Sequence, residues 1–158
     1  FFFLSCRYHG GTAFNCFYCM NLKDLHIGPT DNTPEMILKS EGSILIRGRG
    51  LIINNFTFYE DVSEWVTDYV RSPAEITRVI LSFEYLNSYS LSFVAAILKT
   101  LKTVLRGENG RLSVSWYLEE EDEDILERGL HLSHVTDLPM NFIKVADISE
   151  FNRSKPVL

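Results

Sequence analysis

Cysteine is nearly absent from this chain of 158 residues, because its three cysteines all lie within the first 19 positions. A surplus of positive charge is missing too: 15 lysines and arginines stand against 21 acidic side chains, for a formal net charge of −6. This balance argues against nucleic acid or an anionic membrane surface as a ligand. No apolar run approaches the roughly 18 residues that span a bilayer, so we expect no membrane insertion.

Several catalytic motifs are missing as well. Gly48-Arg49-Gly50 lacks the third glycine of a dinucleotide-binding loop. No P-loop, G-x-S-x-G elbow or H-E-x-x-H helix occurs anywhere in the chain. We therefore expect a protein that is not an enzyme, with no catalytic residues and no cofactor.

The first 19 residues differ in composition from the rest. They hold five of the eleven phenylalanines, one arginine and no acidic residue. We expect residues 1–19 to be an extraneous or disordered leader, residues 20–146 to form one domain, and residues 147–158 to form a polar tail. A body without cysteine is typical of a reducing compartment, which favours the cytoplasm.

The leader also contains a pattern that could bind zinc. Cys6 and His9, followed by Cys16 and Cys19, supply four possible ligands in two close pairs. Their spacing fits no common zinc finger, and no hydrophobic helix is interleaved with them to fold around a metal. An artefactual or disordered leader is the simpler interpretation.

Two further groups could bind metal but have simpler explanations. His131 and His134 lie three residues apart without a matching carboxylate, and such pairs are usually only surface residues. The acidic run over residues 119–124 lacks the spaced ligands and the glycine of a calcium loop. A solvated face that complements a helix dipole explains this run better, so we expect no metal site.

From residue 33 onward the hydrophobic periodicity alternates between strand and helix. It predicts strands over residues 33–38, 43–47, 77–86, 112–117 and 141–145, and helices over residues 59–70, 91–105 and 125–132. Gly48 and Gly50 are expected to break the second strand. The order β-β-α-β-α-β-α-β predicts an α/β fold, a small sandwich in which right-handed crossovers place about three helices against one central mixed sheet.

The segment Tyr85-Leu86-Asn87-Ser88-Tyr89-Ser90 is the most informative part of the chain. A buried strand is expected to end here and a helix to begin, which places Ser88 at the carboxyl edge of the sheet. We expect Ser88 to be the N-cap, because serine is a preferred residue there. The same helix end would stabilise a phosphate on the Ser88 oxygen, although capping alone is the simpler interpretation of the local pattern.

The body of the chain resembles the SiaC family of bacterial regulatory phosphoproteins, whose fold is similar to that of anti-sigma-factor antagonists, the STAS fold. The resemblance extends over about residues 22–145 and is carried by an ordered set of segments rather than by one motif. These segments are Lys23–Ile27, Thr30–Glu35, Phe58-Tyr59, Glu64-Trp65, Tyr85–Ser88, Trp116-Tyr117, Asp122–Asp124 and Asp137–Pro139.

The resemblance implies a partner switch in c-di-GMP signalling. Members are phosphorylated on a Thr or Ser at the strand-to-helix junction by a histidine-kinase-like Ser/Thr protein kinase, and a PP2C-type phosphatase reverses the reaction. The unmodified protein binds and activates a diguanylate cyclase, a GGDEF protein. The family's phosphoacceptor falls on Ser88 in this sequence, and Asn54, Asn87, Tyr89 and Ser90 become further candidates for the partner surface.

The sequence departs from the family pattern in two places. Tyr89 replaces the small residue that commonly follows the acceptor. The segment Leu51-Ile52-Ile53-Asn54 stands where the family often has Tyr-Pro-Glu-Asn, so a charged contact and a rigid turn are lost.

Two alternative interpretations of function stay open. In one, the same phospho-switch acts on an anti-sigma factor or on another kinase-like regulator in place of the cyclase. In the other, the chain is a small metal-dependent enzyme that uses the acidic run or the pair of His131 and His134.

Overall fold

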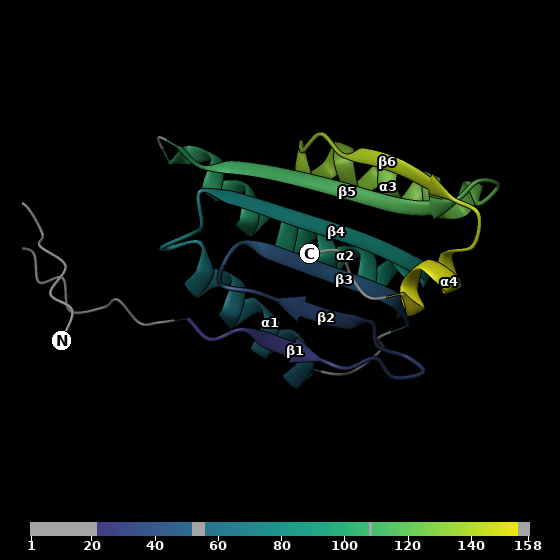
Figure 1. Cartoon of the computed structure of the whole chain (residues 1–158), viewed down its shortest axis with the longest axis horizontal. Coiled ribbons are helices and arrows are strands. Elements are labelled where there is room, and N and C mark those ends of the chain that lie inside the picture. The colour runs from purple at the N-terminus through teal and green to yellow at the C-terminus, as the bar shows by residue number, and fades with distance from the viewer. Residues whose placement is uncertain (1–21, 52–55, 108, 155–158) are drawn as a thin grey trace, which may run out of the picture.

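The computed structural model describes residues 22–51, 56–107 and 109–154 (Figure 1). Three sequence-based expectations concern positions outside these ranges. They are the leader over residues 1–19 with its possible zinc ligands, the partner candidate Asn54, and the departure from the family pattern at Ile52 and Ile53.

Within the described ranges, six strands form one sheet in the order β1-β2-β3-β4-β5-β6. The strands are β1 (Leu25–Ile27), β2 (Glu35–Leu38), β3 (Ser43–Gly50), β4 (Ile76–Leu86), β5 (Arg111–Glu119) and β6 (Asn141–Val145). The helices are α1 (Phe56–Tyr69), α2 (Ser88–Leu101), the 3-10 helix η1 (Lys102–Arg106), α3 (Glu123–Thr136) and α4 (Ile148–Arg153). Neighbours from β1 to β3 pair antiparallel and neighbours from β3 to β6 pair parallel.

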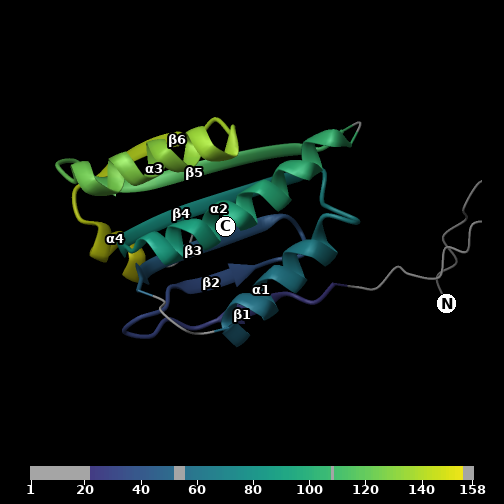
Figure 2. The same cartoon turned by 180° about the vertical axis from the view of Figure 1, so that it is seen from behind.

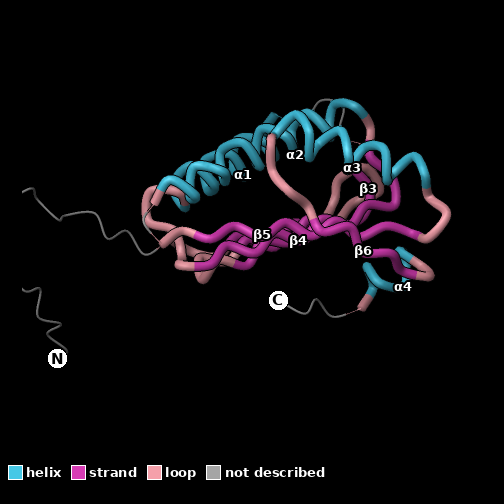
Figure 3. Tube along the Cα trace, turned by 90° about the horizontal axis from the view of Figure 1, so that it is seen from above, coloured by secondary structure: helices cyan, strands magenta, loops and turns pink. Residues whose placement is uncertain are grey.

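Helices α1, α2 and α3 all cover one face of the sheet, and α4 lies on the other face (Figure 3). The strand order explains this arrangement. Right-handed crossovers between four consecutive parallel strands always step in the same direction, so each crossover helix falls on the same side. Figure 2 shows the three helices side by side across the sheet. The expected α/β sandwich with a central mixed sheet is confirmed.

The hydrophobic core lies between the sheet and these three helices. Val79, Leu81 and Phe83 alternate along β4 toward the helices, and each is at most 1% exposed. This alternation is the period of two that a strand with one face on the core requires. Leu98 and Leu101 on the apolar stripe of α2 are fully buried against the same cluster.

The helical stretch Ser88–Arg106 has the length and hydropathy of a candidate membrane span within the described ranges. Its apolar character has an explanation inside the fold. The residues of α2 that turn toward the sheet, Val94, Ile97, Leu98 and Leu101, are buried in the core.

Two of the strands differ from the sequence-based expectation. Strand β3 continues through Gly48 and Gly50, which we expected to break it. Gly48 has a φ of 100°, a conformation open to glycine, and the chain remains paired with β4 beyond it. The three-residue strand β1 was not predicted, because it is too short to show a period and is held by its pairing with β2.

The segment after Asp147 also differs, because residues 148–153 form α4 where we expected a loose polar tail. The Asp147 carboxylate caps this helix by accepting a hydrogen bond from the Glu150 N–H at 2.8 Å. The Phe151 ring stacks on Tyr117 of β5, with 4.4 Å between ring centroids. These tertiary contacts stabilise a helix that is too short to form alone.

Candidate functional site

Strand β4 and helix α2 are joined by a single residue, Asn87. Its N–H donates a hydrogen bond to the Gly50 carbonyl at 2.9 Å and so ties the connection to the end of β3. Gly50 permits a close approach at this place, because a Cβ would lie 2.6 Å from Leu86 Cδ1 and 3.1 Å from Ser90 Cβ. The first turn of α2 therefore packs directly on the carboxyl end of β3.

A β-bulge precedes this junction. Gly48 pairs with Phe83 but Arg49 pairs with Tyr85, so β4 carries Glu84 as an extra residue. Bulges bend a strand and redirect side chains, and they are common beside functional sites. Here the Tyr85 side chain is 47% exposed close to the start of α2.

Asn87, and not Ser88, is the N-cap of α2. Asn87 has an extended backbone, with φ −79° and ψ 167°, and its side-chain oxygen accepts a hydrogen bond from the Ser90 N–H at 2.8 Å. The expectation that Ser88 caps the helix is wrong, since Ser88 is the first helical residue. Asn and Ser are equally favoured as caps, so the sequence could not choose between two adjacent candidates.

The four described candidates at the junction differ in exposure. Ser88 and Tyr89 are exposed, and the Tyr89 side chain reaches 62%. Asn87 is half-buried in its capping position, and Ser90 is only 2% exposed. Ser90 therefore lies beneath the surface on which we expected a partner to dock. In the described part of the chain, the Ser88 hydroxyl makes no hydrogen bond.

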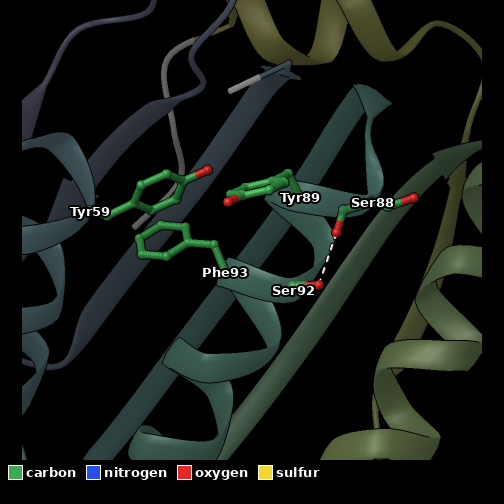
Figure 4. Close-up of a pocket in the computed structure, with 5 residues that line it drawn as sticks. All are labelled: Tyr59, Ser88, Tyr89, Ser92 and Phe93. Atoms are coloured by element: carbon green, nitrogen blue, oxygen red, sulfur yellow. Dashed lines mark hydrogen bonds between the residues drawn. The ribbon is translucent and has the colours of Figure 1, made fainter. Parts of the chain in front are cut away.

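Ser88 and Tyr89 line a pocket of about 560 Å³ together with Tyr59, Ser92 and Phe93 (Figure 4). The Tyr59 and Phe93 rings meet edge to face, with 4.1 Å between their centroids. The Tyr59 and Tyr89 hydroxyls point toward one another, and the Ser92 hydroxyl donates to the Ser88 carbonyl at 2.9 Å. Sequence reasoning missed this pocket, because Tyr59 comes from another helix and its apolar spacing indicated only core.

The Tyr59 hydroxyl oxygen is a buried polar atom in the pocket wall. It has no hydrogen-bond partner of good geometry among the described residues. Burial raises the pKa of Tyr59, the neighbouring Ser90 hydroxyl opposes this rise, and Tyr89 adds to it. Tyr59 is therefore neutral at physiological pH, and this wall of the pocket carries no charge.

The start of α2 supplies the positive electrostatic potential at the site. The N–H groups of Ser88 and Tyr89 belong to the first helical turn, where an α-helix has no internal acceptors. No acidic side chain lies in this turn. The helix dipole favours negative charge at this end, so a phosphate on Ser88 would be locally stabilised.

Neither His131 nor His134 is among the described residues that line the junction pocket. His131 lines a hollow of about 270 Å³ between α2 and α3, beside Asp124, Glu127 and Arg128. His134 lies in the last turn of α3. Within residues 22–51, 56–107 and 109–154, no three His, Cys, Asp or Glu side chains converge on a metal-binding arrangement.

The acidic run over residues 119–124 has local structural roles. The Asp122 carboxylate caps α3 by accepting from the Ile125 N–H at 3.0 Å, and Glu123 and Asp124 lie in the first turn. The Glu119 carboxylate accepts from the Ile148 N–H at 3.1 Å and so helps to hold α4. Negative charge at the start of α3 complements its dipole, as the sequence predicted.

Comparisons with known proteins bear on the fold and the family. Apo-SiaC from Pseudomonas aeruginosa matches with a TM-score of 0.66 and 21% sequence identity, over 77% of this chain and 98% of that one. A chain in the crystal structure of diguanylate cyclase SiaD in complex with its activator SiaC, also from Pseudomonas aeruginosa, matches with a TM-score of 0.68 and 22% identity, over 75% of this chain and 98% of that one. No curated protein matches the sequence significantly. The family model described as SiaC family regulatory phosphoprotein matches residues 27–145, and this chain therefore belongs to the SiaC family.

Proposed function

We propose that this chain is a non-enzymatic partner switch whose unphosphorylated form binds and activates a diguanylate cyclase. A histidine-kinase-like Ser/Thr protein kinase phosphorylates Ser88, and a PP2C-type phosphatase removes the phosphate. We place these steps in the cytoplasm, where the ATP and GTP that the kinase and the cyclase consume are found.

The observation that carries the proposal is the position of Ser88. Its side chain is exposed on the first residue of α2, whereas the nearest competitor, Ser90, is 2% exposed. Because Asn87 caps the helix, the Ser88 hydroxyl is available to a kinase without disturbing the cap. Membership of a regulatory phosphoprotein family supports a phosphoacceptor in the domain. The solved complex of a SiaC protein with the cyclase that it activates supports the class of partner.

Electrostatics explains how the phosphate would act. A phosphoserine carries about −1.5 to −2 charges at neutral pH. A partner that docks over Ser88 would have to desolvate this charge, at a cost of several kcal/mol. Since each 1.4 kcal/mol is about tenfold in affinity, this cost is enough to dissociate a micromolar complex. No conformational change within the domain is needed.

A phosphopeptide map tests the assignment. The purified chain is incubated with its cognate kinase and ATP, and the expected result is phosphate on Ser88. Ser88→Ala should abolish the modification, and Thr100→Ala, a change in the same helix, should leave it intact. Phosphate on Ser92 or Thr100 with Ser88 unmodified would contradict the assignment.

A cyclase assay tests the output of the switch. The unphosphorylated chain and Ser88→Ala should both raise the rate at which the cognate cyclase forms c-di-GMP. Prior treatment with kinase and ATP should remove this activation for the wild-type chain but not for Ser88→Ala. Ser88→Glu should weaken activation only in part, because one carboxylate imitates a dianionic phosphate poorly. Equal activation by the phosphorylated and unphosphorylated chains would refute the switch.

A further inference from the structure

The pocket beside Ser88 has the chemistry of a site for an uncharged side chain. The rings of Tyr59, Tyr89 and Phe93 dominate its described lining, which includes two serines and no charged residue. A charged occupant would lose its hydration without gaining a counter-ion, which is costly. An apolar occupant would instead gain contact with three rings, and aromatic walls of this kind form the centres of many protein interfaces.

Tyr89 is the aromatic wall of the pocket that is most exposed to solvent in the isolated domain. Its side chain is 62% exposed, although burial of a tyrosine ring is favourable. Tyr89 stands next to Ser88, so any partner that senses the Ser88 phosphate also lies within reach of this ring. Tyrosine is enriched among the few residues that carry most of the binding energy in protein complexes.

We propose that this pocket receives one apolar side chain of the cyclase, of about the size of Leu or Phe, and that Tyr89 is the wall that selects it. This inference rests on the proposed function and names the contact through which it works. Because Ser88 itself lines the pocket, phosphorylation places a dianion at the rim of an apolar contact. Docking of the cyclase side chain would then take the phosphate out of water beside an apolar contact, which links the modification directly to release.

The test measures the affinity of the unphosphorylated full chain for the purified cognate cyclase by calorimetric titration. Ser92→Trp fills the pocket from an exposed position on α2 and should weaken binding at least about tenfold. Tyr89→Ala removes the exposed wall and should weaken binding about tenfold, with an unchanged thermal melting curve. Two control variants lie elsewhere: Ser113→Trp on the sheet face away from the three helices, and Leu130→Ala at a 52% exposed position of α3. Both should bind within about twofold of the wild type.

The outcomes separate this inference from the function on which it rests. If the wild-type chain binds the cyclase and Ser92→Trp and Tyr89→Ala bind equally well, the pocket is not the contact and this inference alone fails. If Ser113→Trp weakens binding as much as Ser92→Trp, the cyclase docks on the other face and the inference also fails. If the wild-type chain does not bind the cyclase at all, the proposed function and the inference fail together.

Discussion

The side-chain oxygen of Asn87 accepts a hydrogen bond from the Ser90 N–H at 2.8 Å, and this bond spans the two residues between them, Ser88 and Tyr89. Asn87 and Ser88 could each cap the helix, and this bond shows that Asn87 is the one that does. Asn87 stabilises the start of α2, and Ser88 is left with an exposed side chain at the positive end of the helix dipole. Phosphorylation of Ser88 would therefore add charge to this domain without removing the cap of α2.

This division of tasks predicts different effects on stability. Asn87→Ala should lower the free energy of unfolding by at least about 1 kcal/mol, because it removes the N-cap. Ser88→Ala should change it by less than about 0.5 kcal/mol, because Ser88 is exposed and caps nothing. Urea denaturation of both variants beside the wild type measures the difference. Equal losses in the two variants would mean that Ser88 shares the capping role.

The cap shows where prediction from sequence reached its limit. The β-forming residues from Thr77 to Phe83 predicted β4, and the apolar stripe that includes Leu98 predicted α2; both elements belong to the core. The sequence therefore placed the junction between them correctly. It could not place the cap, since two adjacent residues, Asn87 and Ser88, are both good caps.

Short elements and long-range contacts could not be predicted from the sequence either, for a different reason. Strand β1 and helix α4 have too few residues to show a period, and tertiary contacts such as the stacking of Phe151 on Tyr117 stabilise them. The pocket needs Tyr59 of α1 beside Phe93 of α2, residues that a single sequence does not connect. The candidate phosphoacceptor could be named from sequence, but the surface around it could not.

Gly129 permits the close approach of α3 to the sheet. A Cβ at this position would lie 2.7 Å from the Phe142 ring and 2.8 Å from the ring of Trp116, which is fully buried. Gly129→Ala should therefore lower the free energy of unfolding by about 1–3 kcal/mol through overpacking, although alanine is the better helix former. Thermal denaturation checks this result. Gly28→Ala is the matched control, since its Cβ would meet nothing within 4 Å, and a loss there as large as at Gly129 would refute the steric explanation.

Tyr59→Phe should make the isolated domain more stable. The Tyr59 hydroxyl is buried without a good hydrogen-bond partner in the described part of the chain, and such a group costs about 1–3 kcal/mol of desolvation. Removing it should raise the melting temperature by a few degrees. Tyr69→Phe is the matched control with the opposite expected sign, because the Tyr69 hydroxyl is hydrogen-bonded to Thr77 Oγ1 at 2.7 Å. A lower melting temperature for both variants would show that Tyr59 also has a stabilising partner.

Glu35 connects three strands at the edge of the sheet, and its ionisation should make stability depend on pH. Its carboxylate contacts Arg47 of β3 at 2.6 Å and His26 of β1 at 3.0 Å. Burial alone would raise the pKa of Glu35, but hydrogen bonds and charge from Arg47 and His26 outweigh it and hold the pKa below the ordinary value of 4.5. The folded state therefore binds the proton less tightly than the unfolded state does.

The sign of the effect follows from this difference in proton binding. The contribution of Glu35 to stability is fully present above pH of about 4.5 and is lost as the pH falls through the lower pKa of the folded state. Glu35→Gln should lower the free energy of unfolding by about 1–3 kcal/mol at pH 7, and the gap from the wild type should narrow below pH of about 4. Urea denaturation between about pH 3 and 7 measures both curves, with Glu60→Gln, an exposed position on α1, as the control. A gap that stays constant over this range would mean that the glutamate acts through packing and not through its charge.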